Sequence, residues 1–376
     1  GSNYFERVTY RLEPVPGGVN LIIRVVEKTT NFFKVGLNYN SEMNAALLLN
    51  ATLRNVLIEG SRISLDLRLG NNLNTDLTWI IHTGLKPGFA IKDYHRFNRL
   101  DVYAYDYDGN KLAEFDFSQH VFGLEIMTTY ANSFCLSTGM ELELNTLKNT
   151  ISPAIWNSPD EEHNNLLSYL IEFNLDMLDK SVYPLSGVKL HLLSRYITQE
   201  VVEQDGYSPF FRFFVEYHER LRLNPWWSTY FKFWGASVQT EKEITTDKIV
   251  YLGSQTVKGS ENIPFLGLEF MELSARHGAT ALVGAQYEFF PNWFLLYEFN
   301  VGKVSNKLEY LFRDISYTNS KDVNDINNQQ LLKERYVYGG GLTIGTESPI
   351  GPIEVTLTRN SRDSDLNFYF SVGYQF

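Results

Sequence analysis

Cysteine, positive charge and long apolar runs are scarce in this 376-residue chain, and each scarcity removes a class of protein. The single cysteine, Cys135, excludes an intrachain disulfide, a cysteine zinc site and an iron–sulfur cluster. A net charge of −11 argues against nucleic acid as the main partner, because phosphate binding needs a dense Lys/Arg face. No apolar run reaches the ~18 residues of a membrane helix, but strands of a membrane barrel carry a much weaker hydropathy signal.

Aromatic residues and strict alternation are what the chain has in abundance. It contains 26 Phe and 23 Tyr, residue types that favour strands and membrane interfaces. In the segment 61–70, apolar and polar side chains occupy opposite faces: Ile63, Leu65, Leu67 and Leu69 on one, Arg62, Ser64, Asp66 and Arg68 on the other. The same period of two recurs in 134–145, 211–223 and 366–376. Ten or more residues of alternation per segment fit lipid outside and water inside.

About sixteen such segments can be placed, and bacterial barrels have an even number of strands. They are expected at 31–39, 44–53, 61–70, 75–84, 89–105, 112–129, 134–147, 165–177, 187–197, 210–223, 226–238, 278–290, 293–303, 335–346, 351–359 and 366–376. A hairpin of two further strands, 4–13 and 18–27, precedes them. The sequence therefore predicts an all-β chain: residues 1–29 form a hairpin and residues 30–376 form a sixteen-stranded antiparallel transmembrane β-barrel.

The connections fall into two classes. Tight turns follow even-numbered strands, as at Asn224-Pro225 and Pro291-Asn292, whereas the longer loops 148–164, 198–209, 239–277 and 304–334 follow odd-numbered ones. Short periplasmic turns and long external loops are typical of outer-membrane barrels. This order of short and long connections predicts that the N-terminus and Phe376 both lie on the periplasmic side.

Aromatic residues gather beside the short turns and predict a girdle at the periplasmic membrane interface. They are Tyr130, Phe134, Trp226, Trp227, Phe289, Phe290, Trp293 and Phe294.

Few residues suggest chemistry. Arg212, Glu216, His218 and Arg220 share one strand face, and paired charges lining a polar lumen explain them better than a metal or proton site. Gly339-Gly340-Gly341 lacks the spacing of a phosphate loop and is interpreted as inward glycine in a crowded barrel. No Gly-x-Ser-x-Gly segment occurs. We predict no catalytic residue, no metal site and no cofactor.

Several stretches resemble the barrel of the outer-membrane assembly-factor and two-partner-secretion transporter superfamily. The segment 21–28 is similar to the closing strands of a polypeptide-transport-associated (POTRA) domain, and 35–40 to the first barrel strand. Asp179 with Tyr183, Pro184 and Gly187 resembles the family's turn between strands eight and nine. The C-terminus, with Gly373, Tyr374 and Phe376, resembles the last hairpin and its terminal-aromatic assembly signal. The first strand must pair with the last to close the barrel, and the small inward residues Gly36 and Gly373 leave little side-chain packing to strengthen this seam.

The sixth external loop, 239–277, departs from the family pattern. It offers Pro264, Phe265 and Gly267 in place of a Val-Arg-Gly-aromatic motif. This loop and the single POTRA remnant look more like the patatin-like phospholipase branch, which implies a lipase domain, with its Ser-Asp dyad, upstream of Gly1.

The leading hypothesis is therefore an outer-membrane barrel that anchors, and exports or orients, an N-terminal lipase domain, with no enzymatic activity in this chain. The alternatives are an assembly or secretion factor acting through the seam of first and last strands, and a passive channel. Expected partners are outer-membrane lipids, lipopolysaccharide, and the lipase domain or a periplasmic protein. A homodimer is left open.

Overall fold

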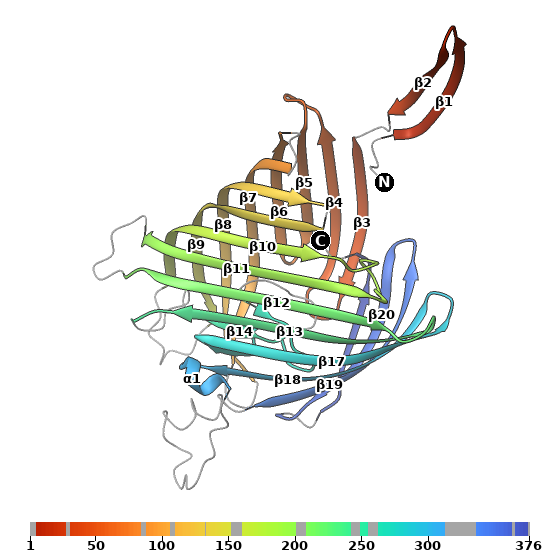
Figure 1. Cartoon of the computed structure of the whole chain (residues 1–376). Helices are drawn as coiled ribbons and strands as arrows, with labels where there is room; N and C mark the ends of the chain where they lie inside the picture. Colours follow the sequence, from red (N-terminus) through yellow and green to blue (C-terminus); the bar gives the residue numbers. More distant parts are fainter. Residues whose placement is uncertain are drawn as a thin grey trace, which may run out of the picture.

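The chain folds as a hairpin followed by a barrel, and Figure 1 shows the computed structural model. The structure describes residues 5–27, 31–83, 88–105, 110–131, 133–151, 160–200, 208–241, 249–254, 262–312, 336–362 and 365–374. The hairpin consists of β1 (Phe5–Val15) and β2 (Gly18–Glu27), which form a two-stranded sheet of their own. It stands away from the barrel in Figure 1.

Sixteen antiparallel strands close on themselves, which confirms the predicted fold class. They are β3 (Phe32–Asn40), β4 (Asn44–Arg54), β5 (Ser61–Gly70), β6 (Leu73–His82), β7 (Gly88–Tyr105), β8 (Lys111–Tyr130), β9 (Phe134–Ile151), β10 (Glu161–Asp176), β11 (Gly187–Glu200), β12 (Phe210–Arg222), β13 (Trp227–Gln239), β17 (His277–Phe290), β18 (Trp293–Ser305), β19 (Val337–Ser348), β20 (Gly351–Asn360) and β21 (Asn367–Val372). Each barrel strand pairs with the barrel strands before and after it in the sequence, and the last, β21, pairs with the first, β3.

Alternation sorts the side chains between the two faces of the wall. On β3, Phe33, Val35 and Leu37 are exposed on the outside, whereas Asn38 and Asn40 are buried inside. In a membrane the outer row contacts acyl chains, and the polar row faces the lumen. Glu219, a polar residue on the outer face of β12, accepts a hydrogen bond from the hydroxyl of Tyr217 at 2.9 Å.

Most predicted strands differ from the structure by a few residues at their ends, and three segments differ in a way that has a structural reason. Much of the predicted loop 148–164 is strand, because β9 and β10 stay paired out to Lys148 and Glu161. The predicted last strand, 366–376, is shortened to β21, because Gly373 adopts φ +98°, which extended strands do not use. The predicted loop 239–277 contains a three-stranded sheet of β14 (Val250–Leu252), β15 (Asn262–Ile263) and β16 (Leu273–Ala275).

Helix is nearly absent from the described part of the chain. Its one helix is α1 (Leu308–Leu311), and no described helix is long and apolar enough to cross a membrane.

A closed barrel predicts heat-modifiable migration. We expect the folded protein to run at a different apparent mass from a boiled sample in SDS gels, because detergent does not open the ladder of hydrogen bonds at room temperature. Identical migration before and after boiling, together with monomeric solubility without detergent, would contradict a membrane barrel.

Candidate functional site

Described residues of the segment between β13 and β17, the predicted sixth external loop, fold against the inner wall of the barrel. We call residues 249–254 and 262–276 of this segment the inserted loop. Leu252, Ile263, Phe265 and Leu273 of this loop are almost completely buried. The loop is therefore part of the barrel core.

Glycines in the wall make room for the tip of the inserted loop. A Cβ atom added to Gly302 on β18 would lie 2.8 Å from Cε2 of Phe265, and one on Gly339 of β19 would lie 2.9 Å from Cε1. Both distances are shorter than carbon atoms tolerate. Gly302 and Gly339 thus form a cradle for Phe265, and an added Cβ on Gly341 would lie 3.5 Å from Leu266 of the same loop. Gly340 has no loop atom near its added Cβ, so the interpretation as inward glycine holds for Gly339 and Gly341 and not for Gly340.

Polar contacts tie the inserted loop to distant strands. The carbonyl of Gly267 accepts hydrogen bonds from Nδ2 of Asn360 at 2.6 Å and of Asn367 at 3.1 Å. The Tyr105 hydroxyl donates to the carbonyl of Phe270 at 3.0 Å. These bonds join the loop to β20, to β21 and to the far end of β7. The third predicted loop residue, Pro264, is buried beside Phe265.

A second insertion enters from the opposite end of the barrel, at the turn between β10 and β11. Asp179 organises this turn, since its Oδ1 accepts from the backbone nitrogens of Leu185 at 2.9 Å and Ser186 at 3.3 Å. Gly187 starts β11 at φ +116°, where a side chain would collide with the carbonyl of Met177. Asp179 and Gly187 thereby shape the turn that presents Tyr183 and Pro184, both buried.

Tyr183 anchors the turn on the wall formed by β18–β20. Its ring stacks on Phe294 with centroids 4.2 Å apart, and its hydroxyl donates to Oε1 of Glu354 at 2.8 Å. Burial, and then the Glu354 carboxylate, raise the pKa of Tyr183 well above its usual value, so the phenol remains a donor. Phe294 is 2% exposed and faces inward, which corrects its assignment to the interfacial girdle. The reason is that adjacent strand residues face opposite sides, and Trp293 takes the outward one.

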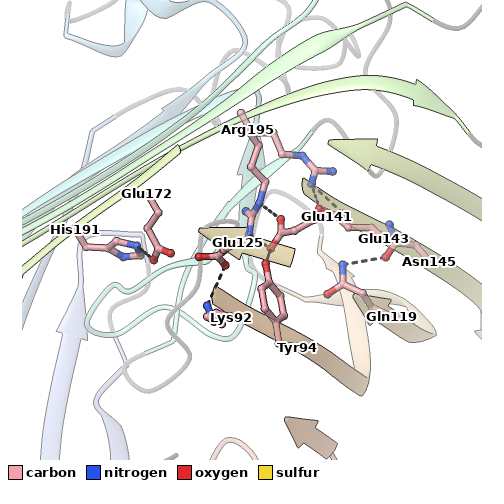
Figure 2. Close-up of polar contacts among 11 residues, drawn as sticks. Lys92, Tyr94, Gln119, Glu125, Glu141, Glu143, Asn145, Glu172, His191 and Arg195 are labelled. Atoms are coloured by element: carbon pink, nitrogen blue, oxygen red, sulfur yellow. Dashed lines mark hydrogen bonds and ion pairs between the residues drawn. The ribbon is translucent and has the colours of Figure 1, made fainter. Parts of the chain in front are cut away.

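The inner wall carries ion pairs that bridge strands, and Figure 2 shows those on β7–β11. Lys92 pairs with Glu125 at 3.0 Å, Arg195 with Glu141 at 2.5 Å, and His191 with Glu172 at 2.7 Å. Gln119 donates to Asn145 at 2.9 Å. A charged side chain is tolerated in a buried position only when a partner of opposite charge lies beside it. The partners here come from different strands, so the contacts connect the strands through their side chains.

All four predicted lumenal residues lie on the inner face of β12. Arg212 pairs with Glu143 at 3.1 Å, and Glu216 with Lys189 at 3.0 Å. Arg220 donates to His218 at 3.0 Å and to Gln286 at 2.7 Å. The sequence analysis did not identify Glu143, Lys189 and Gln286 as the partners of these residues. Their inward positions in the alternating pattern are the signal that could have identified them.

The described residues contain no group of three His, Cys, Asp or Glu side chains that could hold a metal ion.

Among the described residues, the junction of β3 and β21 is the shortest in the barrel. Its register contains two residue pairs, Ser371 with Asn40 and Val372 with Tyr39. Every other junction has at least six pairs, from β20–β21 upwards. Gly373 packs directly on the backbone of β3, where an added Cβ would lie 3.0 Å from the carbonyl carbon of Leu37. The described residues therefore leave most of β3 without a partner on its β21 side.

The remaining predicted seam residues are placed as follows. Gly36 lies on the inner row of β3 against Leu48, and Tyr374 is exposed just beyond β21. Phe376 lies outside the described residues.

Comparisons with known proteins agree with this architecture. The family model of the OMP85 superfamily matches residues 19–376. Among solved structures, BamA from Haemophilus ducreyi lacking POTRA domains 1–3 superposes with a TM-score of 0.72 at 14% identity, covering 98% of this chain and 75% of that one. CdiB from Acinetobacter baumannii gives 0.54 at 12% identity, covering 98% and 65%, and CdiB from Escherichia coli gives 0.56 at 11%, covering 97% and 67%. No curated protein gives a significant match.

Two neighbouring glycines test the docking of the inserted loop. We expect Gly339→Val to cost about 1–3 kcal/mol of folding free energy by overpacking against Phe265, and to expose the loop to added protease. Gly340→Val is the control, since the nearest atom to its added Cβ is 3.7 Å away. Protease resistance equal to that of the native protein in Gly339→Val would show that the loop does not depend on the cradle.

Tyr183→Phe tests the second insertion. Loss of a hydrogen bond to a charged group should lower the free energy of unfolding by about 1.5–3 kcal/mol, measured by urea unfolding in lipid vesicles followed by tryptophan fluorescence. Tyr297→Phe, exposed on the outer face of β18, should change it far less. Equal effects of the two substitutions would remove the special role of the Tyr183–Glu354 contact.

Proposed function

The chain belongs to the OMP85 superfamily, and from this premise we propose that it is a bacterial outer-membrane barrel that assembles or exports a polypeptide through the seam between β3 and β21. The two-pair seam is the observation that carries the proposal. In lipid, each unsatisfied backbone group costs several kcal/mol, so a junction resists opening in proportion to its paired length. The seam is accordingly the junction that opens at least cost.

The orientation we propose places the N-terminus in the periplasm. The connections at that end of the barrel are short, as between β17 and β18 or between β19 and β20. The opposite end carries the long segments between β13 and β17 and between β18 and β19. We further propose that β1 and β2 are the closing hairpin of a POTRA domain in this compartment.

A finer proposal concerns the cargo. The chain spans 75% of the matched BamA chain and 65–67% of the CdiB chains, so what the whole protein does is a proposal in its own right. We propose that it anchors and exports or orients a patatin-like lipase domain lying upstream of Gly1. The support is the inserted loop, whose docked residues Pro264, Phe265 and Gly267 replace the arginine motif of the secretion transporters. In this proposal the barrel carries no catalytic group, and a Gly-x-Ser-x-Gly segment in the upstream gene sequence would support it.

Locking the seam tests the leading function. Tyr39 and Val372 face each other across it, so Tyr39→Cys with Val372→Cys in a Cys135→Ser background can form a disulfide under oxidation. We expect the oxidised lock to halt assembly or export of the dependent polypeptide in cells that rely on this copy, and reduction to restore it. The control lock joins Tyr169 and Tyr196, which face each other inside the long β10–β11 junction, and should be silent.

The opposite outcome is equally informative. If the seam lock and the control lock both leave growth and assembly unchanged while the barrel remains heat-modifiable, the barrel works as an anchor with a permanently closed seam.

A further inference from the structure

A cavity of about 750 Å³ lies in the lumen beside β5–β11, on the side that the inserted loop leaves unfilled. Polar side chains line much of it, including Arg68, Asn74, Asn98, Gln119 and Arg195, and Phe270 of the inserted loop closes one side. A chamber of this size holds a small molecule or a few residues of a peptide.

Four arginines line this cavity, and three of them are paired with carboxylates. Arg96 pairs with Asp76 at 3.2 Å, Arg99 with Asp116 at 2.5 Å, and Arg195 with Glu141 at 2.5 Å. Arg68, the fourth, forms no ion pair with any described residue. Most carboxylates of the cavity have partners of their own: Glu125, Glu141 and Glu143 pair with Lys or Arg side chains, and Glu172 contacts His191. Asp66 contacts the neutral amide of Asn50.

Arg68 lies two residues before the end of β5, and one edge of its guanidinium has no hydrogen-bond partner among the described residues. It lies on the inner face of β5, directly between Leu48 of β4 and Asn74 of β6. Its Nε and Nη2 are both buried, and no described group accepts a hydrogen bond from either. These two nitrogens form the side of the guanidinium that binds an oxyanion through two parallel hydrogen bonds. Because protein atoms cover both nitrogens, the guanidinium must turn toward the cavity to present them to an anion.

The surroundings of Arg68 favour an anion of modest charge. Asp66 lies two residues earlier on the same face, and its Oδ1 is occupied by Nδ2 of Asn50 at 2.5 Å. Asn74 and Asn98, bonded to one another, bring amide groups to the same side of the cavity. An oxyanion here would meet the guanidinium of Arg68 and neutral amides, and the nearby Asp66 carboxylate limits the negative charge that the site tolerates.

We propose that the lumen cavity binds an oxyanion, a carboxylate or phosphate group, through the bidentate edge of Arg68. This inference is independent of the seam and of the cargo, because it rests only on the cavity and its side chains.

The test uses the full chain refolded in detergent micelles, with heat-modifiable migration as the check that each variant is folded. Equilibrium dialysis at low salt measures uptake of radiolabelled inorganic phosphate in one arm and radiolabelled succinate in the other. We expect saturable binding at one site per barrel. Binding in one arm only identifies the group as phosphate or carboxylate, and binding in both indicates a general oxyanion site.

Three variants decide whether Arg68 carries the binding. Arg68→Gln should weaken it by about tenfold or more, the loss expected when hydrogen bonds to a charged group disappear. Arg68→Lys keeps the positive charge but cannot form two parallel hydrogen bonds, so it should also weaken binding. This variant provides the test if Arg68→Gln does not fold. Lys34→Gln removes a charge outside the cavity lining and should bind like the native protein.

Two results would overturn the proposal. One is the absence of saturable uptake of either anion by the native protein. The other is unchanged affinity in Arg68→Lys or Arg68→Gln, which would mean that water alone solvates this guanidinium in the lumen.

Discussion

Every backbone N–H and C=O group within the hydrocarbon must find a partner in the protein, and the whole structure follows from that requirement. A sheet satisfies it only by closing, so sixteen strands form one ring. Closure directs alternate residues to lipid and forces the polar ones into the lumen. In the described part of the chain this requirement is met least completely between β3 and β21, where the register contains two residue pairs. The same rule that stabilises the barrel therefore identifies where it opens at least cost.

Inside the barrel, two inserted segments fill part of the lumen, and ion pairs between strands neutralise the inward charges. The inserted loop fills the side near β18 and β19, where Gly302 and Gly339 accept Phe265. From the other end, Tyr183 reaches Phe294 and Glu354 on the same side. Opposite them, ion pairs such as Arg195 with Glu141 line a hollow half of the lumen. Because those pairs neutralise each other, Arg68 stands out as the one cavity arginine without a carboxylate partner among the described residues.

The alternation of apolar and polar residues was sufficient to predict the strands and their inner faces, because that pattern is local. Arg212, Glu216, His218 and Arg220 were assigned to the lumen on this basis and lie there. The wall residues that the inserted loop contacts could not be identified, since Phe265 and Gly339 are far apart in sequence and nothing local to either indicates the other. Phe294 was assigned to the girdle because aromatic clustering was given more weight than the alternation that separates it from Trp293. The absence of a partner for Arg68 depends on the positions of Asp66, Asp76 and Asp116 together, which no single strand pattern contains.

Hydrogen–deuterium exchange in lipid vesicles tests the central claim, that the seam is the weakest junction, most directly. Backbone amides on β3 point alternately toward β4 and toward β21. We predict that, between Phe32 and Asn38, every second amide, the set directed toward β21, exchanges much faster than those directed toward β4. Amides shared by β7 and β8, whose pairing runs from Gly88 to Tyr105, should be protected throughout. Equal protection of both sets of β3 amides, at the level of β7, would contradict the account.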